Sequence, residues 1–444
     1  MPAFFRSRLL SLVTLAAALI GVLPAVAAER PNVILMMADD LGWSDLSCYG
    51  SEHLQTPTLD RMASEGARLT NFYAGCTVCT PSRMALLTGA YPKRLGWPGG
   101  VGGYRIPWNH GLATQAVTMA EVFRDAVYAT AMFGKWHLGN DPRMLPRGQG
   151  FESALYITAS NNQTKKLWRN EELVADPFDN RRLTELFAAE AMQFLRTRDQ
   201  RPFFLYLPFS APHFPAEAHP DWDGKSNNAA YGDVVEELDA RIGEIMAVLR
   251  ETQLDRNTIV VFLSDNGPEP GQRKWASAKP FRGLKWSSLE GGNRVPCIAR
   301  FPGTIPADQS LDHLTAAIDL LPTLAEACRI PLPVDSVPQR DGVSVWQTWT
   351  RPGQPASHPR TELLFWNGWA ELEAIRAENW KLYLTEVDGI AGSAAGPVLI
   401  NLQDDPAEER NVAAEHAERV RTMRTLAEQL AADIAAHSIP LGQP

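Results

Sequence analysis

The chain alternates short apolar runs with longer stretches in which apolar residues recur every three or four positions. Runs of the first kind span residues 32–37, 128–133, 203–209 and 257–263. Their near-continuous apolar character is typical of parallel strands covered on both faces. The periodic stretches 117–126 and 231–252 predict amphipathic helices. Strands alternating with helices predict an α/β fold with a large, mostly parallel sheet flanked by helices.

Polar residues follow each of the four predicted strands. In chain order they are Asp39 and Asp40, then Lys135 and His137, then His213, and finally Asp265 and Asn266. The carboxyl ends of parallel strands meet at one edge of a sheet, which is where open α/β folds bind ligands. The carboxylate and amide oxygens form a hard set that suits calcium or magnesium. The pattern therefore predicts one polar rim that holds a divalent cation.

The stretch Cys79-Thr80-Pro81-Ser82-Arg83 places a cysteine just before a predicted helix. Thr80 is expected to be the N-cap and Pro81 the first helical residue. The N–H groups of a first helical turn favour a negatively charged neighbour. These residues are consistent with an anionic ester bound beside Cys79, or with a capping loop that carries a free thiol.

With Leu86-Leu87-Thr88-Gly89, this stretch resembles the type I sulfatase signature C-x-P-S-R-x-x-L-L-T-G at every fixed position. Gly134-Lys135-Trp136-His137-Leu138-Gly139 and the runs 282–285 and 290–296 resemble further sulfatase motifs, so the resemblance extends from residue 31 to about residue 302. It implies an alkaline-phosphatase-like layered fold. It also implies hydrolysis of an aryl sulfate or a sulfated carbohydrate to the alcohol and inorganic sulfate.

The same resemblance implies two cofactors. A maturation enzyme that reads Cys79, Pro81 and Arg83 would convert Cys79 into formylglycine, whose hydrated aldehyde is the nucleophile. One divalent ion, usually calcium with magnesium as the alternative, would be held by an oxygen of residue 79 together with Asp39, Asp40, Asp265 and Asn266.

Roles for the remaining polar residues also follow from the resemblance. Arg83 would orient the hydrated aldehyde and pair with carboxylates of the ion, while Lys135 and Lys285 would neutralise the sulfate oxygens. His213, helped by Lys285, would protonate the leaving alcohol. His137 would take a proton from the second hydroxyl, so that sulfate leaves and the aldehyde forms again.

Residues 1–28 differ from the rest: Arg6 and Arg8 precede an apolar run that ends in Ala25-Val26-Ala27. This pattern predicts a secretory signal peptide, with a membrane anchor as the alternative, and hence a periplasmic or secreted protein without stable membrane insertion. Loss of the two arginines takes the formal charge from −9 to −11. The acidic chain has no long basic run, which argues against nucleic-acid binding and favours a small sulfated substrate held by local cations.

Five cysteines are an odd number for an exported chain, and conversion of Cys79 explains the unpaired one. Cys48, Cys76, Cys297 and Cys328 are left to form two disulfides or none.

We expect the catalytic domain to span residues 29–349 and a smaller domain to span 350–444. Its predicted strands are 362–366, 373–376, 380–384 and 398–402, in an antiparallel sheet, and a closing helix is expected from about Pro406, more surely Val420, to Ala436. Another helix is expected over 311–328. The loop 97–110 is suited either to stacking on a substrate ring or to packing on the surface.

Two other functions are compatible with parts of this pattern. A phosphatase or phosphonate hydrolase of the same superfamily would share the sheet and the rim, but a two-zinc enzyme needs more histidine ligands than the matched motifs supply. An inactive binding protein is disfavoured because none of the matched catalytic positions is substituted.

Overall fold

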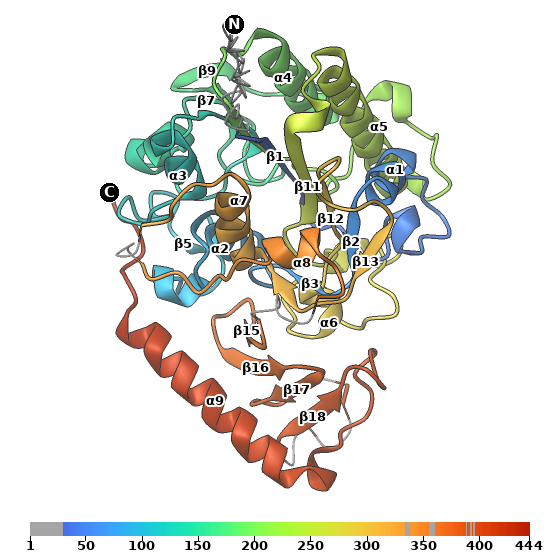
Figure 1. The fold of residues 1–444 in the computed structure, drawn as a ribbon, viewed down its shortest axis with the longest axis vertical. Helices are drawn as coiled ribbons and strands as arrows, with labels where there is room; N and C mark the ends of the chain where they lie inside the picture. The colour runs from blue at the N-terminus through green and yellow to red at the C-terminus, as the bar shows by residue number, and fades with distance from the viewer. Residues whose placement is uncertain (1–29, 334–337, 355–359, 388, 391–392, 394–395) are drawn as a thin grey trace, which may run out of the picture.

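The computed structural model describes residues 30–444 except 334–337, 355–359, 388, 391–392 and 394–395, so the predicted signal peptide lies outside the described residues. One sheet dominates the fold (Figure 1). Its ten strands follow the order β13 (Gln309–Leu311), β2 (Ala67–Leu69), β12 (Cys297–Arg300), β11 (Thr258–Ser264), β1 (Asn32–Ala38), β10 (Phe203–Pro208), β6 (Ala129–Lys135), β7 (Ser153–Ile157), β8 (Leu167–Arg169) and β9 (Glu172–Ala175).

The centre of this sheet is parallel. Strand β1 pairs in parallel with both β10 and β11, and β6 pairs in parallel with β10 and β7. Strands β12, β8 and β9 run antiparallel to the neighbours that join them to the sheet centre. All four predicted strands therefore form and lie side by side, which confirms the predicted mostly parallel sheet.

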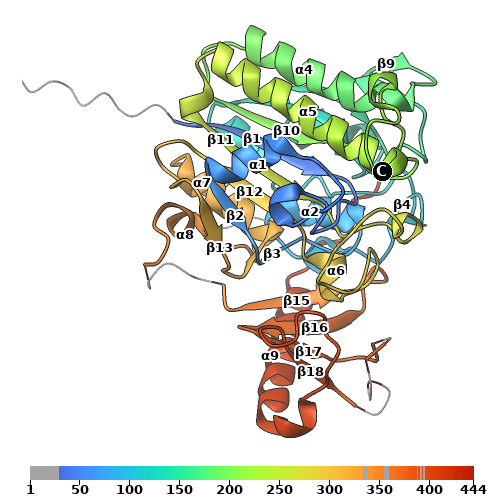
Figure 2. The same ribbon diagram turned by 90° about the vertical axis from the view of Figure 1, so that its right-hand side faces the viewer.

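Helices cover both faces of the sheet (Figure 2), which explains the uninterrupted apolar character of β1. Val33, Leu35 and Met37 pack on one face with α2 (Cys79–Thr88), α3 (Met119–Asp125) and α7 (Leu320–Ala327). The alternate residues Ile34 and Met36 pack on the other face with α1 (Pro57–Ser64), α4 (Leu183–Thr197) and α5 (Ala229–Glu251). The short helices α6 (Glu290–Asn293) and α8 (Trp346–Thr350) and the strand pairs β3 (Phe72–Tyr73) with β14 (Thr315–Ala316) and β4 (Val101–Gly102) with β5 (Arg105–Ile106) complete this part.

A second sheet lies at the lower end of the molecule in Figure 1. We call it the C-terminal sheet: β15 (Glu362–Trp366), β16 (Leu372–Ala377), β17 (Trp380–Tyr383) and β18 (Val398–Asn401), antiparallel in chain order. Helix α9 (Ala417–Ala436) packs on it. The chain then returns to the main sheet's side, where the Ile439 N–H donates to Arg94 and Gly442 pairs with Gly111. The antiparallel sheet and closing helix agree with the predicted fold class.

The prediction that Thr80 caps α2 was wrong. Val78 is the N-cap, without a side-chain hydrogen bond, and Cys79 is the first helical residue. The Thr80 hydroxyl instead accepts from the Gly102 N–H at 3.1 Å, so it ties the helix start to strand β4.

Two predicted helices begin later than expected. Residues 311–316 carry the ends of β13 and β14, and α7 begins only at Leu320, after Asp319 accepts a hydrogen bond from the Ala316 N–H. Helix α9 begins at Ala417, later than the outer bound at Pro406 but three residues before the firmer bound at Val420, because Asp405 and Glu408 hold the preceding residues in turns. Helix α3 begins at Met119 because Thr118 forms a capping box with Glu121.

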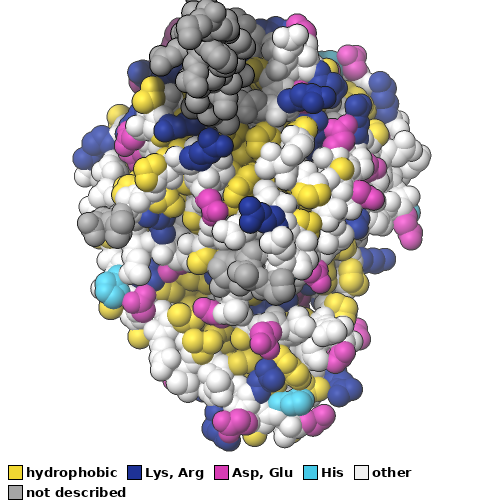
Figure 3. Space-filling view, in the orientation of Figure 1, with side chains coloured by type: hydrophobic (Ala, Val, Ile, Leu, Met, Phe, Trp, Pro, Cys, Tyr) yellow, Lys and Arg dark blue, Asp and Glu magenta, His cyan; other side chains and the backbone are white. Residues whose placement is uncertain are grey.

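The structure also shows the surface charge, the character of the helices and the state of the cysteines. On the face in Figure 3, basic and acidic side chains are interspersed. Within the described part of the chain, no helix combines the length and apolar character of a membrane span. The sequence left open whether Cys48, Cys76, Cys297 and Cys328 form two disulfides or none. In the structure these four and Cys79 are free thiols.

Candidate active site

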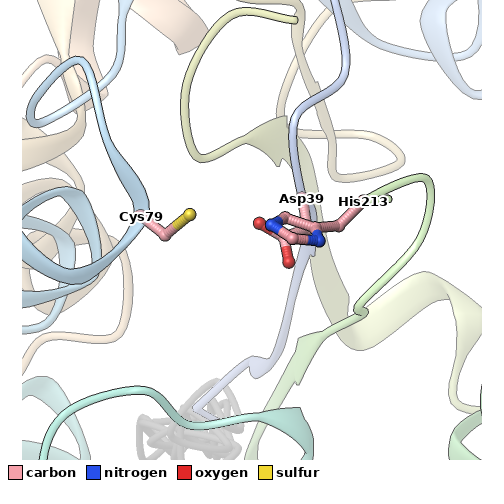
Figure 4. Close-up of side chains that lie close together, drawn as sticks. All are labelled: Asp39, Cys79 and His213. Atoms are coloured by element: carbon pink, nitrogen blue, oxygen red, sulfur yellow. The ribbon is translucent and has the colours of Figure 1, made fainter. Parts of the chain in front are cut away.

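The polar ends of the central strands meet the start of α2 at one rim. Cys79 extends from α2 towards Asp39, which follows β1, and His213, which follows β10 (Figure 4). One atom from each of these three side chains lies within 4.8 Å of the other two. Residues far apart in the sequence therefore converge, as the strand order predicted.

A buried group of charges lies at this rim, and we call it the rim cluster: Asp39, Asp40, Arg83, Lys135 and Asp265. All five side chains are inaccessible to solvent. Arg83 donates to Asp265 Oδ2 through Nη2 at 2.7 Å and Nε at 3.2 Å, and to the Lys135 carbonyl through Nη1 at 2.9 Å. Lys135 Nζ donates to Asp39 Oδ2 at 2.6 Å. Arg83 and Lys135 thus hold two carboxylates side by side.

Asp40 receives a different set of partners. Its Oδ2 accepts from Lys285 Nζ at 2.8 Å and lies 3.6 Å from His213 Nε2. Its Oδ1 accepts from Asn266 Nδ2 at 2.7 Å. Asp40 also has φ 69°, a left-handed conformation that aspartate tolerates better than most residues. The turn after β1 therefore points both aspartates into the site.

Two buried oxygens at the rim accept no hydrogen bond from the described residues. They are Asp39 Oδ1, which lies 3.4 Å from Arg83 Nη2, and Asn266 Oδ1. Buried acceptors of this kind are rare in folded proteins unless a ligand completes them. One oxygen each from Asp39, Asp40 and Asp265 also lie within 4.8 Å of one another. The donor set and its unpartnered oxygens fit a hard divalent cation.

The electrostatics of the rim cluster show crowding of like charges. Burial and then the charge of Asp39 raise the pKa of Asp265 to about 7, against Arg83 and Lys135. Burial also opposes ionisation of Asp39, but Lys135 and the other nearby cations hold its pKa well below the usual range. A bound cation would favour the charged form of both carboxylates.

His137 lies at the end of the turn after β6, with φ 60°. Its Nε2 lies 3.2 Å from the Gly102 carbonyl, which can only accept, so Nε2 carries the proton of the neutral ring. Its buried Nδ1 has no partner among the described residues. Burial, followed by Lys135 and Arg83, lowers the pKa of His137 well below its ordinary value. The imidazole is therefore neutral and offers a lone pair at Nδ1.

His213 is oriented by a residue that the sequence analysis missed. Its Nδ1 lies 2.7 Å from the Phe214 carbonyl and 3.1 Å from Asn161 Oδ1, so Nε2 is left facing Asp40. Burial lowers the pKa of His213 to about 4, although Asp40 opposes this shift. Asn161 follows β7, a strand that was not among the four predicted, but the same rule of polar residues after strands would have found it.

Cys79 itself makes few contacts. Its Sγ lies 4.0 Å from Asp40 Oδ1, and burial raises the pKa of the thiol above its ordinary value. Val78 provides no side-chain cap, so the first N–H groups of buried α2 stay available to an anion. As it stands, Cys79 is a neutral thiol rather than a thiolate nucleophile.

A second missed residue is Glu269, whose Oε2 lies 3.1 Å from Lys285 Nζ. It comes four residues after Asp265 on the same loop, but a lone glutamate in a turn gives no signal of its own. The structure thus brings together Cys79, Arg83, Lys135, His137, His213, Lys285, Asp39, Asp40, Asp265 and Asn266, all with buried side chains.

The sequence and the fold of the chain are similar to those of known proteins. A family model described as Sulfatase matches residues 31–330. An arylsulfatase of Hemicentrotus pulcherrimus is 35% identical over 340 residues, which cover 71% of this chain and 61% of the relative. An N-acetylgalactosamine-6-O-sulfatase of Bacteroides thetaiotaomicron is 31% identical over 490 residues, which cover 91% of this chain and 93% of the relative.

A solved Bacteroides thetaiotaomicron structure, described in terms of the metabolism of multiple glycosaminoglycans, superposes with a TM-score of 0.80 at 28% identity and covers 91% of this chain and 99% of its own. The chain thus spans about three fifths of the first relative and nearly all of the two bacterial proteins.

Proposed function

The chain belongs to the sulfatase family, and from that premise we propose that it is a sulfuric ester hydrolase acting at the rim cluster. The observation that carries the proposal is the convergence of Cys79 with buried carboxylates, cations and two histidines. Sulfate-ester cleavage needs positive charge against the sulfate oxygens, a nucleophile near sulfur and a proton for the departing alcohol. The rim supplies a residue for each requirement.

We propose that Asp39, Asp40, Asp265, Asn266 and residue 79 hold one divalent cation, calcium or alternatively magnesium. The unpartnered oxygens of Asp39 and Asn266 support this assignment. The cation would withdraw charge from the sulfate oxygens, and formylglycine made from Cys79 by a maturation enzyme would supply the nucleophilic oxygen. Arg83 would keep Asp39 and Asp265 in place and orient residue 79.

Lys135 and Lys285 would neutralise the sulfate group from two sides. Both ammonium groups already touch rim carboxylates, at 2.6 Å from Asp39 and 2.8 Å from Asp40. They are buried, so their attraction for an anion is weakly screened by water. Their positive charges offset the carboxylates that would otherwise repel the ester.

The two histidines would divide the proton transfers. His137 would accept a proton at Nδ1, the ring nitrogen without a partner among the described residues. His213, helped by Lys285, would deliver a proton from Nε2 to the oxygen of the leaving alcohol. Burial holds the pKa of free His213 at about 4, and a bound anionic ester would raise that pKa and favour the protonated form.

The substrate is proposed more broadly, as a small sulfated aromatic or carbohydrate. Similar proteins are named as an arylsulfatase and an N-acetylgalactosamine-6-O-sulfatase, and both alcohol types present an apolar face. Tyr104 and Trp369, which are 51% and 39% exposed, have ring centroids 6.0 Å apart. The loop 97–110 is thus partly packed, with Trp97 buried, and partly open to a ligand.

The deciding experiment combines mass and turnover. In protein from its natural host, the peptide containing Cys79 should have the mass of formylglycine, and the protein should hydrolyse aryl sulfates faster than aryl phosphates or phosphonates. Cys79→Ser should give at most one turnover per enzyme, because a single hydroxyl cannot regenerate itself as a hydrated aldehyde can.

A matched control uses the neighbouring cysteine. Cys76 is also buried, and its Sγ contacts the Trp366 carbonyl at 3.8 Å, outside the rim cluster. Cys76→Ser should retain multiple turnover. Multiple turnover by Cys79→Ser, or full activity with an unmodified, alkylatable Cys79 thiol, would refute the proposed nucleophile.

We further propose that residues 1–28 are removed on export to the periplasm or outside the cell, and that a catalytic domain to residue 349 is followed by a smaller domain from 350. N-terminal sequencing of the protein purified from its host should start at Ala28 or Glu29. A start at Met1 in the mature protein would contradict cleavage.

A further inference from the structure

Lys285 lies on a segment without regular secondary structure. Residues 282–290, which we call the Lys285 segment, run from the loop after β11 to the first residue of α6. Three backbone hydrogen bonds tie its middle to other segments. Lys285 N–H donates to Pro268 and Trp286 N–H donates to Thr77, each at 3.0 Å, and the Trp286 carbonyl accepts from the Gly368 N–H at 3.4 Å. A catalytic side chain on such a segment needs further support to stay in position.

Both ends of the segment are held by residues from the C-terminal part of the chain. At the first end, Arg282 Nε donates to the Ala407 carbonyl at 2.6 Å. At the second end, Lys381 Nζ of β17 donates to the Ser288 carbonyl at 2.7 Å. Lys285 thus lies three residues from each of these two side-chain contacts. Figure 2 shows α6 next to the C-terminal sheet.

The second attachment is a buried group that we call the clamp cluster: Glu290, Lys381 and Glu408. Lys381 Nζ lies 2.9 Å from Glu290 Oε1 and 3.1 Å from Glu408 Oε1, and all three side chains are inaccessible to solvent. Glu408 Oε2 also accepts from the Glu290 N–H at 2.7 Å. One ammonium therefore fixes both a carboxylate of the segment and the carbonyl two residues before it.

We propose, on the basis of the proposed sulfatase function, that Lys381 and Glu408 are positioning residues that keep Lys285 directed at the site. Neither residue touches the rim cluster in the contacts described here, so they act through the Lys285 segment. The C-terminal sheet would thereby take part in catalysis by fixing one of the two lysines that face the sulfate.

One test measures the position of Lys285 without any assay of hydrolysis. Acylation of the folded protein by an N-hydroxysuccinimide ester, followed by peptide mass spectrometry, reports how protected each lysine is. In Lys381→Met, acylation of Lys285 should rise about tenfold relative to Lys135, whose place on β6 does not depend on the clamp cluster. An unchanged ratio of the two lysines would overturn the proposal, whether or not the chain is a sulfatase.

A second test separates positioning from general damage. A displaced Lys285 would assist the leaving alcohol less, so kcat should fall more for phenyl sulfate than for 4-nitrophenyl sulfate, whose phenolate leaves readily. We expect the ratio of the two kcat values to change about tenfold in Lys381→Met. Mere loss of folded enzyme would lower both values equally, and such an equal loss would refute the positioning role.

The matched control is Arg360→Met. Arg360 also makes a buried ion pair, with Nη2 at 2.6 Å from Asp319 Oδ1, but this pair joins a residue two positions before β15 to the start of α7 rather than to the Lys285 segment. Arg360→Met should leave both the acylation ratio and the kcat ratio unchanged.

Glu408→Gln is the second test variant, because it keeps the side-chain volume of Glu408. It should change both ratios in the same direction as Lys381→Met, but only about threefold, and it decides the matter if Lys381→Met does not fold. Wild-type protein that fails to cleave any sulfate ester would refute the proposed function, while the acylation test would still decide the position of Lys285.

Discussion

The rim cluster and the clamp cluster both bury charged side chains, but only in the clamp cluster do protein donors satisfy every carboxylate oxygen. In the clamp cluster, both oxygens of Glu290 and of Glu408 accept hydrogen bonds, from Lys381, Tyr73, Tyr383 and the Glu290 backbone. At the rim, Asp39 Oδ1 and Asn266 Oδ1 accept none from the described residues. The two clusters are equally buried but differ in their hydrogen bonding. Protein atoms satisfy the carboxylate oxygens of the clamp cluster, whereas the rim keeps acceptors for a ligand.

Asp265 at the rim and Glu290 in the clamp have pKa values that shift in opposite directions. Burial raises the pKa of Asp265 to about 7, and the nearby charge of Asp39 adds to the effect. Burial also acts on Glu290, but Lys381 and then Arg294 outweigh it and lower that pKa to about 2. Each cluster also holds a carboxylate that shifts the other way, because nearby cations lower the pKa of Asp39 and burial raises the pKa of Glu408. A cation bound at the rim would favour the charged form of Asp265.

The largest expected effect breaks the rim alone. Asp265→Asn should lower kcat/KM for an aryl sulfate about a thousandfold, because the cation loses a charged ligand and the sulfate loses the charge withdrawal that the cation supplies. In the cation-free protein the thermal midpoint should not fall, because a carboxyl whose pKa is raised from 3.8 to about 7 on folding weakens the folded state at neutral pH, and asparagine removes that cost. A variant that kept a tenth or more of the activity would show that Asp265 is not a ligand.

The second effect breaks the clamp. Lys381→Met should lower the free energy of the first unfolding transition by about 3–5 kcal/mol, because two buried carboxylates lose their shared cation. Urea titration followed by tryptophan fluorescence measures this change. The control Lys274→Met, at an exposed lysine, should leave the transition in place. An equal decrease in the free energy of unfolding in both variants would show that the buried ion pairs of Lys381 do not stabilise the fold more than an exposed lysine does.

Cation removal sharpens the contrast. At a calcium concentration of a hundred to a thousand times its Kd, binding to the folded form should add about 3–4 kcal/mol of stability, which a chelator would remove. This difference should vanish in Asp265→Asn and persist in Lys381→Met, because the clamp cluster supplies no ligand to the cation at the rim. A melting temperature of the wild-type protein that is the same with calcium and with chelator would argue against a cation at the rim.

The sequence predicted the rim better than it predicted the clamp, for a physical reason. Asp39, His213 and Asp265 follow apolar strands and Lys135 ends one, and strand order alone brings such residues to one edge. Lys381 lies inside the short strand β17 and Glu408 lies in a turn, and neither position has a periodic pattern around it. Their meeting with Glu290 depends on how the C-terminal sheet packs on the main body, which local sequence does not encode.

The predicted helix starts were less accurate than the strands for a related reason. Threonine is a common N-cap residue, but the Thr80 hydroxyl accepts a hydrogen bond from the Gly102 N–H in another segment. Likewise Asp319 accepts from the Ala316 N–H and also pairs with Arg360, so it organises a turn where the periodicity suggested a continuous helix. Long-range contacts decided both boundaries.

The smallest expected effect uses pH to isolate one clamp carboxylate. The pKa of Glu290 is about 2 in the folded protein, below its ordinary value of 4.5, so the folded state holds fewer protons than the unfolded state in that interval. Its contribution to stability is therefore complete above about pH 4.5 and is lost as the pH falls towards 2, by at most about 3 kcal/mol. Burial raises the pKa of Glu408, so the contribution of Glu408 to stability changes only at pH values above its ordinary pKa. Within the clamp cluster, the loss of stability at acid pH therefore comes from Glu290.

Urea midpoints measured with chelator from pH 6 down to pH 2.5 test this. They should fall less steeply for Glu290→Gln than for the wild type, while the exposed control Glu428→Gln should follow the wild type. Parallel acid limbs in all three proteins would show that Lys381 does not hold Glu290 in its charged form.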